Sequence, residues 1–351
     1  MVRGRMHGIA RYALELARRL PRHLPPDWQV AGLTGPQGLP EGLGALQPDL
    51  PLERSRAGFL SPLEQPLLVA SLLQSGCDLF HATSFSLPAL WTGRLVATLH
   101  DANHLALSEE YGPGRVAYYR LVVGPRAQRA QALIAPSQFA RDELARHLSL
   151  DPHRFQVIPQ GVAEQFQPPA ASALESFRAR HRLPARYLVA VGNPKPFKNL
   201  GLLAKIAESL PVPIVLLAGA GAARQLGFPA STVQLSELPE AELPLLYGGA
   251  QALLLPSRYE GFGLPALEAM ASGCPVIAAE AGSLPEVIGE AGLLLPPDDR
   301  DRWIQGTLRL LRDPPHRQQL IERGLERAAR ATWEACAIRT AAVYQRALGR
   351  P

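Results

Sequence analysis

The chain has 351 residues, 47% of them hydrophobic, which is enough to build two cores of ordinary size, so two domains are predicted. Three cysteines lie far apart and outside any Cys-x-x-Cys spacing, which argues against a disulfide framework or a zinc site and fits a reducing cytoplasm: Cys77, Cys274 and Cys336. The net charge of +5 suits nucleic acid, an anionic membrane or a phosphorylated ligand, but the arginines are not clustered with aromatic residues, which disfavours nucleic acid.

The N-terminal region carries several arginines but no apolar run, and no later stretch approaches the about 18 uninterrupted apolar residues of a membrane span. The sequence therefore predicts a cytoplasmic protein with neither signal peptide nor membrane-spanning helix. From His7 onward it predicts an amphipathic helix whose arginines lie mostly off an apolar face made of Ile9, Ala13, Leu16 and Leu20. This segment is interpreted as an ordinary surface helix, with a membrane-contacting or acceptor-binding face as the alternative.

In the first half, short apolar runs alternate with helical patterns, which predicts a parallel sheet. The runs are 29–33, 78–82, 95–99, 132–135 and 155–158. His100 and Asp101 follow the third run, so their side chains are expected at the carboxyl edge of that sheet. A single histidine at a strand end is structural more often than catalytic, and both interpretations of His100 stay open.

After a stretch rich in Pro and Ala, the same alternation restarts, which predicts a second doubly wound domain. Its apolar runs are 187–191, 214–218, 232–235, 252–255 and 276–279. The predicted organisation is a Rossmann-like domain at 1–164, a linker at 165–172, a second Rossmann-like domain at 173–330 and a C-terminal helix at 331–351. The pattern does not decide which domain that helix packs against.

The strongest motif runs from Arg258 to Glu268, directly after a predicted strand, and opens a helix. Open α/β sheets bind ligands at this edge, and a helix N-terminus offers N–H groups and a positive dipole end to an anion. Gly261 and Gly263 allow the backbone to approach such a ligand closely. The carboxylates of Glu260 and Glu268 suit sugar hydroxyls rather than phosphate. The alternative is that Glu260 only favours the helix dipole and that Glu268 is a solvated residue.

A second loop, from Val191 to Asn199, also lies between a predicted strand and a predicted helix. It contains two of the only three lysines, Lys195 and Lys198, in a chain that otherwise uses arginine, which suggests a point-charge contact to phosphate. Lys198 is placed to stabilise negative charge on a departing nucleoside diphosphate without a metal. The alternative is a surface lysine that begins a helix, with Asn199 near the cap.

Two acidic motifs are interpreted as helix starts. Asp299-Arg300-Asp301 resembles a metal-binding Asp-x-Asp, but it follows two prolines and begins a helix, where acidic residues favour the dipole, so no metal site is predicted. The segment from Ser283 to Glu286 is interpreted as a capping box.

Taken in order, these segments resemble glycosyltransferase family 4, a retaining family of the GT-B type, over nearly the whole chain. The resemblance rests on Glu260 to Val276, the Lys198-Asn199 pair, Thr98 to Asp101, Ala135 to Ser137, and Ile158 to Val162. It implies an α/β fold of the GT-B class, in which two Rossmann-like doubly wound domains face each other across a cleft. The first domain would bind the acceptor, the second would bind a nucleotide sugar, and the last helix would pack back on the first.

The resemblance also implies roles for single residues. Lys198 would contact the donor diphosphate, Glu260 the sugar hydroxyls and Glu268 the ribose. His100 would lie beside the transferred sugar, and Gly8 would let an acceptor-side loop approach the diphosphate. The candidate catalytic residues are thus Lys198, Glu260 and His100, and the candidate donor-binding residues are Gly8, Asn193, Lys198, Gly261, Phe262, Gly263, Leu264 and Glu268.

Three features depart from the family pattern. The chain opens almost directly at its glycine loop, so either the start is misassigned or the first sheet lacks a strand. That loop reads His7-Gly8-Ile9-Ala10, with fewer glycines than is common. Asn193 stands where an arginine is common, and Gln160 replaces a usual asparagine. These departures weaken the expected binding of the donor phosphates. They motivate an alternative, a nucleotide-sugar-binding protein with impaired or no turnover.

The predicted function is retaining transfer of a mannose- or glucose-type hexose from GDP-mannose or a UDP-hexose to a glycan or lipid-linked acceptor. No metal and no cofactor besides this donor substrate are expected. The enzyme would work in polysaccharide biosynthesis at the cytoplasmic face of the plasma membrane, in peripheral contact with anionic lipid and without nucleic acid. Another GT-B enzyme, such as an NDP-sugar epimerase or a phosphorylase, is a further alternative. Acceptor contacts are expected in 111–129, with Tyr118 and Arg115.

Overall fold

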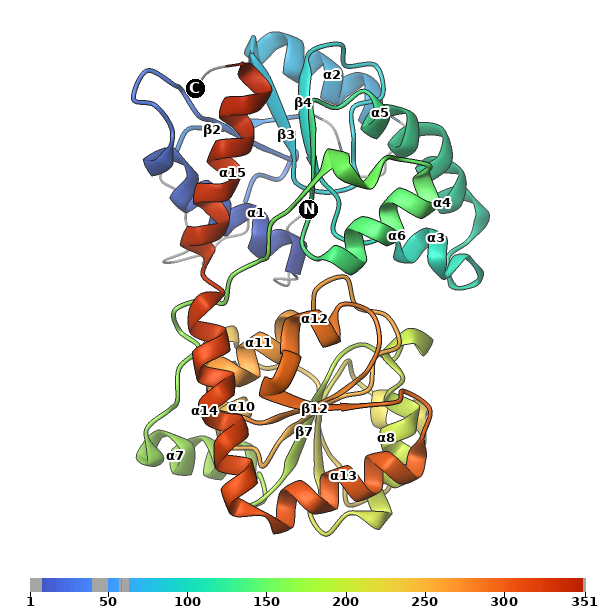
Figure 1. Cartoon of the computed structure of the whole chain (residues 1–351), viewed down its shortest axis with the longest axis vertical. Coiled ribbons are helices and arrows are strands. Elements are labelled where there is room, and N and C mark those ends of the chain that lie inside the picture. Colours follow the sequence, from blue (N-terminus) through green and yellow to red (C-terminus); the bar gives the residue numbers. More distant parts are fainter. Residues whose placement is uncertain (1–7, 40–49, 57, 59–62, 350–351) are drawn as a thin grey trace. The chain divides into compact units, whose positions relative to one another are not determined.

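The computed structural model describes residues 8–39, 50–56, 58 and 63–349. They form two compact units: the first combines the chain up to Gly161 with the C-terminal segment from Trp333, and the second is Val162–Thr332. Both units are parallel sheets covered by helices (Figure 1). Among the described residues, no helix has both the length and the apolar character needed to cross a membrane.

The main sheet of the first unit has four parallel strands in sequential order: β3 (Leu79–Ala82), β4 (Arg94–Thr98), β5 (Ala132–Ala135) and β6 (Phe155–Val157). A separate parallel pair joins β1 (Gly32–Thr34) to β2 (Leu52–Arg54). Each apolar run predicted in this half overlaps a strand. The sequence did not predict β2, because its Leu-Glu-Arg side chains are all exposed and carry no apolar pattern.

The helices of the first unit surround this sheet. They are α1 (Gly8–Arg19), α2 (Glu64–Ser75), α3 (Asn103–Ala106), α4 (Pro113–Tyr118), α5 (Gly124–Gln128), α6 (Gln138–Leu148) and α15 (Trp333–Leu348). A π-helical stretch, Tyr119–Val123, joins α4 to α5.

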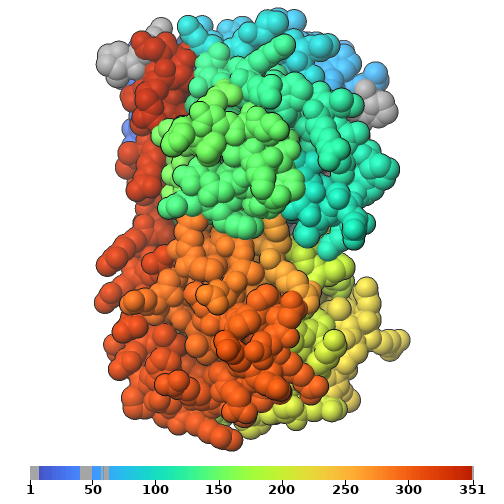
Figure 2. Space-filling model, turned by 45° about the vertical axis from the view of Figure 1, so that its right-hand side comes forward, coloured from blue at the N-terminus to red at the C-terminus, as the bar shows by residue number. Residues whose placement is uncertain are grey.

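The C-terminal helix α15 packs against α1, β3 and β4 of the first unit (Figure 1). A chain of polar contacts fixes it there: the Tyr344 hydroxyl lies 2.5 Å from His81 Nδ1, and His81 Nε2 lies 2.8 Å from Thr98 Oγ1. The Thr98 hydroxyl is in turn 2.9 Å from the hydroxyl of Tyr12 in α1. The opposite face of the helix remains at the surface of this unit (Figure 2), where Ile338 is half exposed.

Helix α1 buries charged residues that the sequence placed at the surface. Glu15 is only 1% exposed and pairs with Arg11 (3.2 Å), Arg18 (3.3 Å) and Arg19. Arg19 also reaches Glu334 of α15, with 3.5 Å between its Nε and the carboxylate. The prediction of an ordinary surface helix was wrong for Arg11 and Arg19, because a shared carboxylate and the neighbouring α15 allow them to be buried, whereas Arg18 is partly exposed and Arg22 is exposed.

The second unit has a six-stranded parallel sheet in the order β12-β11-β10-β7-β8-β9. The strands are β7 (Leu188–Val191), β8 (Ile214–Leu217), β9 (Val233–Leu235), β10 (Leu253–Leu255), β11 (Val276–Ala279) and β12 (Gly292–Leu295). The chain runs outward from β7 through β8 and β9, then returns to the other side of β7 at β10. This reversal is a topological switch point, where open α/β sheets form their ligand crevice. The apolar patterns predicted every strand except β12.

Helices cover both faces of this sheet, with α8 and α13 on one side and α10, α11 and α14 on the other (Figure 1). The helices are α7 (Ala171–His181), α8 (Leu200–Ile206), α9 (Ala222–Leu226), α10 (Leu243–Gly248), α11 (Leu264–Ala271), α12 (Leu284–Ile288), α13 (Arg300–Arg312) and α14 (Pro314–Arg330). The strands β7, β10 and β11 are buried along their whole length, which explains why they read as continuous apolar runs.

Candidate functional site

The candidate site lies at the carboxyl ends of β7 and β10, the neighbouring strands at the switch point of the second unit. The loop after β7 carries Lys198, and the loop after β10 carries Glu260. Lys198 Nζ donates to Glu260 Oε1 over 2.7 Å, and the two side chains are only 18% and 11% exposed. Two residues that the sequence singled out in separate motifs therefore meet as an ion pair.

The loop that carries Lys198 is braced on both sides. The Arg258 N–H donates to the Phe197 carbonyl over 2.8 Å, which joins the two loops of the site. The Asn199 side chain donates to the Pro297 carbonyl, also over 2.8 Å, instead of capping α8. Lys195 and Lys198 each place an ammonium 5.6 Å from the centre of the Phe197 ring. Asn199 does stand at the N-cap position of α8, as the alternative predicted, but its side chain makes no capping hydrogen bond, and Lys198 is largely buried rather than a surface lysine.

The backbone of Glu260 is held by the loop before α12. Gly282 has φ +61° there, and an added Cβ would lie 2.8 Å from the Glu260 nitrogen and 2.9 Å from its carbonyl oxygen. The N–H and the hydroxyl of Ser283 both donate to that carbonyl, over 3.1 and 3.0 Å. The capping-box prediction for Ser283 to Glu286 was wrong, because the Ser283 hydroxyl binds Glu260 rather than the first turn of α12. Sequence reasoning missed this contribution to the site, although the Gly-Ser dipeptide after a strand was its visible signal.

The glycine-rich loop brings the N-terminus of α11 to the same edge of the sheet. Gly263 has φ +97° at the N-cap of α11, and a Cβ there would lie 2.9 Å from Leu284 Cδ2, so both conformation and space require glycine. Phe262 is buried and Leu264 begins the helix. The positive dipole end of α11 therefore lies at the edge that carries Lys198.

Glu268 and Asn193 have different surroundings. Glu268 is half-buried in α11, where its Oε2 accepts from the Tyr247 hydroxyl over 3.2 Å, so its interpretation as a solvated residue was wrong. Burial raises the pKa of Tyr247 and the Glu268 carboxylate raises it further, which keeps the phenol protonated and donating. Asn193 is exposed, and its Oδ1 accepts from the Lys195 N–H over 3.4 Å within the loop.

Two candidate residues belong to the first unit. His100 follows β4 with its Nε2 3.0 Å from the Thr83 carbonyl and its Nδ1 3.0 Å from the Gln160 amide nitrogen. A carbonyl only accepts, so Nε2 carries the proton and Nδ1 accepts from the amide, which makes the imidazole neutral. Sequence reasoning treated Gln160 only as a departure from the family pattern and missed Thr83. Gly8 is the exposed first residue of α1, whereas His7 lies outside the described residues.

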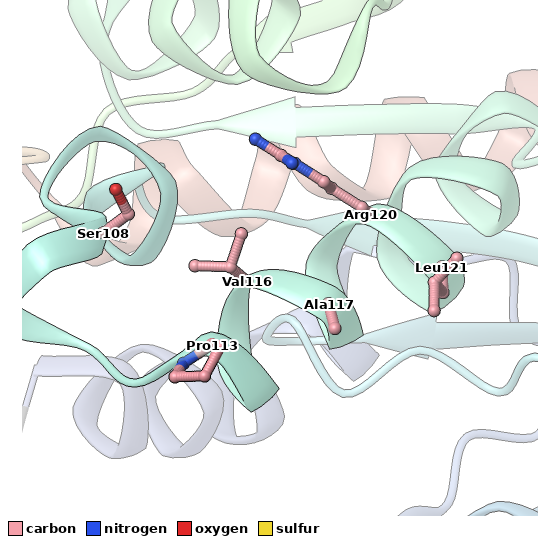
Figure 3. Close-up of a pocket in the computed structure, with 6 residues that line it drawn as sticks. All are labelled: Ser108, Pro113, Val116, Ala117, Arg120 and Leu121. Atoms are coloured by element: carbon pink, nitrogen blue, oxygen red, sulfur yellow. The ribbon is translucent and has the colours of Figure 1, made fainter.

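The segment expected to contact an acceptor borders a pocket of about 550 Å³ (Figure 3). Its lining is mostly apolar and comes from Ser108, Pro113, Val116, Ala117, Arg120 and Leu121. Neither Tyr118 nor Arg115 lines it: the Tyr118 hydroxyl accepts from the Gln65 amide over 3.2 Å, and Arg115 lies 5.5 Å from the Tyr111 ring centre. Burial raises the pKa of Tyr118 to about 12, so the phenol is neutral in this contact. The π-helical turn after α4 supplies Arg120 and Leu121.

The Asp-x-Asp motif serves a helix start, as the sequence predicted. Asp299 is the N-cap of α13, and its Oδ1 accepts from the Arg302 N–H over 3.0 Å. Over the residues that the structure describes, no group of three or more His, Cys, Asp and Glu side chains is placed to hold a metal ion.

Each half of the chain matches a known protein-family model. A family model described as glycosyl transferases group 1 matches residues 173–327, and one described as glycosyltransferase family 4 matches residues 6–166. The chain is 28% identical to the O-antigen chain mannosyltransferase B of Escherichia coli over 96% of both chains. It is 31% identical to a D-inositol 3-phosphate glycosyltransferase of Kineococcus radiotolerans, over 74% of this chain and 67% of that protein.

Solved structures of the same fold include two with TM-scores well above 0.7. Sucrose-phosphate synthase from Thermosynechococcus elongatus has a TM-score of 0.79 at 22% identity, covering 98% of this chain and 94% of that one. Anabaena HepE, solved in complex with UDP and glucose, has a TM-score of 0.77 at 20% identity, covering 97% and 96%. At this level of identity the likeness is one of fold.

Proposed function

The chain belongs to the group 1 glycosyltransferases and has the GT-B fold. From that premise we propose that it transfers a hexose from a nucleoside diphosphate donor with retention of anomeric configuration. The observation that carries the proposal is the Lys198–Glu260 pair at the switch point of the second unit, beside the N-terminus of α11. A cation and a carboxylate side by side match the two halves of such a donor, its diphosphate and its sugar hydroxyls.

In this proposal Lys198 and the positive end of α11 stabilise the negative charge that grows on the departing diphosphate, so no divalent metal is required. Glu260 accepts hydrogen bonds from the sugar, and Glu268 from the ribose. The bond between the anomeric carbon and the phosphate oxygen breaks, and the acceptor oxygen bonds to that carbon from the same face. The acceptor's proton passes to the departing phosphate, so no protein nucleophile is needed.

Mannose from GDP-mannose is the donor we favour, with a UDP-hexose as the alternative. The likeness to the E. coli O-antigen mannosyltransferase over nearly the full length supports mannose and a glycan acceptor. The pocket at α4 supports an acceptor with an apolar part, because its wall is apolar except for the Ser108 hydroxyl and the Arg120 guanidinium (Figure 3). A lipid-linked acceptor held at the cytoplasmic face of an anionic membrane fits that chemistry.

Calorimetric titration in EDTA with GDP, UDP, GDP-mannose and UDP-glucose tests the donor site. We expect one base to bind without metal, and Lys198→Ala to weaken binding at least about tenfold and to slow transfer by about 10²- to 10³-fold. Lys205→Ala is the matched control, because Lys205 is the only lysine outside the loop and is exposed at the end of α8, so binding should be unchanged.

The anomeric configuration of the product, read from its NMR coupling constants, tests retention. Binding that requires a divalent metal, or an inverted product, would contradict the proposed mechanism. Donor binding with neither transfer nor hydrolysis would indicate a nucleotide-sugar-binding protein instead.

A further inference from the structure

The two groups assigned to the donor are bound to each other in the structure. Lys198 Nζ and Glu260 Oε1 are 2.7 Å apart, and both side chains are largely shielded from water. A diphosphate that binds Lys198 brings a second anion to a position that the Glu260 carboxylate already holds. Because both anions compete for the same ammonium, donor binding weakens this pair.

The backbones of both partners are held in place, so only their side chains can respond. The Glu260 carbonyl accepts two hydrogen bonds from Ser283, and Gly282 packs directly against the Glu260 backbone. The Lys198 loop is fixed by the Arg258–Phe197 and Asn199–Pro297 hydrogen bonds. The pair therefore opens by rotation about side-chain bonds, and the carboxylate remains in the site after it leaves Lys198.

We propose that Glu260 is the internal counter-ion of Lys198, and that its exchange for the donor diphosphate makes the site select a nucleotide sugar over a free nucleoside diphosphate. The inference rests on the proposed donor site. A carboxylate that loses its partner in a shielded position is costly unless other donors replace the lost one. The hydroxyls of the transferred sugar supply those donors, whereas a free nucleoside diphosphate has no sugar beyond its diphosphate to supply them at Glu260.

The exchange also gives product release a driving force. Once the sugar has left for the acceptor, Glu260 loses the hydroxyls that compensated it. The carboxylate then competes again with the diphosphate for Lys198. The same ion pair thus disfavours the spent nucleotide after each transfer.

The test compares affinities for the nucleoside diphosphate and for its sugar conjugate in the wild type and in Glu260→Gln. In the wild type we expect the sugar conjugate to bind at least about tenfold more tightly, the factor that about 1.4 kcal/mol gives. Glu260→Gln should tighten binding of the nucleoside diphosphate by about tenfold and bring the ratio of the two affinities close to one. Unchanged affinity for the nucleoside diphosphate in this variant would overturn the exchange.

A matched control distinguishes loss of the Lys198–Glu260 pair from a general change in the charge of the site. Asp298→Asn removes one carboxylate that pairs with Arg258, a residue of the loop that carries Glu260. If Lys198 is the target of the exchange, Asp298→Asn should change affinity for the nucleoside diphosphate less than about threefold. Equal tightening by both variants would contradict the proposal and indicate a long-range charge effect.

A second measurement observes the Lys198 side chain directly. The chain contains only Lys195, Lys198 and Lys205, so protein labelled with ¹³C at lysine Cε gives three side-chain signals, and Lys198→Ala identifies the one of interest. That signal should move when the nucleoside diphosphate or its sugar conjugate is added, and should be displaced in ligand-free Glu260→Gln. A Lys198 signal unaffected by Glu260→Gln would overturn the pair itself. Absence of any nucleotide binding to the wild type would instead reject the donor site, and the exchange with it.

Discussion

The carboxyl edges of the two main sheets use polar groups in different ways. At the edge of the second unit a lysine and a glutamate on two loops face each other as an ion pair. At the edge of the first unit His100 lies between the Thr83 carbonyl and the Gln160 amide as a neutral ring. Neutral groups that satisfy each other fix a conformation, whereas an ion pair between mobile side chains can be exchanged for a charged ligand. We therefore infer that the second unit provides the exchangeable contacts of the donor site.

In the first unit, buried charged side chains stabilise the packing of helices instead. Glu15 holds Arg11 and Arg19 inside α1, and Arg19 extends the contact to α15. The chain from Tyr344 through His81 to Thr98 adds a second link between α15 and the sheet. The comparison predicts that changes to these groups affect stability, while changes around Glu260 affect donor affinity.

The largest effect is expected for Glu15→Gln. This change removes the buried carboxylate that Arg11, Arg18 and Arg19 share, so the free energy of unfolding of the first unit should fall by about 3–5 kcal/mol. Hydrogen exchange measured peptide by peptide in α1 and α15 checks this. Glu143→Gln is the control, because Glu143 pairs with a mostly exposed arginine, Arg146, and should cost less than about 1 kcal/mol. Equal protection in the two variants would show that the α1 cluster does not stabilise the unit.

An intermediate effect is expected for Gly282→Ala. The new Cβ would clash with the Glu260 backbone, so we expect a loss of about 1–3 kcal/mol in stability together with at least tenfold weaker donor binding. Gly221→Ala is the matched control: its φ of +77° is also positive, but no atom lies within 4 Å of the added Cβ. It should lose some stability and retain donor affinity. If both variants bound the donor with equal affinity, Gly282 would not be needed for donor binding.

The third expected effect is a pH dependence in the first unit. Burial lowers the pKa of His81 from 6.5 to about 3, and the neighbouring His100 contributes in the same direction. The unfolded chain then binds more protons than the folded one between these values. The contribution is therefore complete above about pH 6.5 and is lost as the pH falls toward 3, by up to about 1.4 kcal/mol per pH unit.

Urea denaturation at pH 6.5, 5.5 and 4.5 checks this dependence. His81→Gln should reduce the slope of stability against pH by about one proton, because the group that titrates only in the unfolded chain is gone. His153→Gln serves as control, since His153 is exposed in a 3₁₀ turn and its loss should leave the slope unchanged. A slope that is the same in all three proteins would mean that His81 titrates in the folded protein as in the unfolded chain.

Much of the fold could be predicted because buried parallel strands leave a strong local pattern. Val276 to Ala279 is apolar at every position and was assigned to the residue, and the C-terminal helix predicted at 331–351 lies at Trp333–Leu348. The strand Leu52–Arg54 was missed because it is exposed on both faces and carries no apolar alternation. The family and the GT-B fold predicted from the motifs are both confirmed by the comparisons.

The sequence by itself determined most of the strands, the order of the motifs, and that Lys198 and Glu260 follow strands of one domain. It could do so because apolar periodicity, glycine positions and strand ends are local properties of the chain. Only the tertiary structure decided that Lys198 and Glu260 pair, that Ser283 supports Glu260 rather than capping α12, and that Glu15 makes α1 a buried helix. Each of these contacts depends on where a side chain finds its partner, and the partners of Lys198 and Glu260 lie 62 and 23 residues away, beyond the reach of any local pattern.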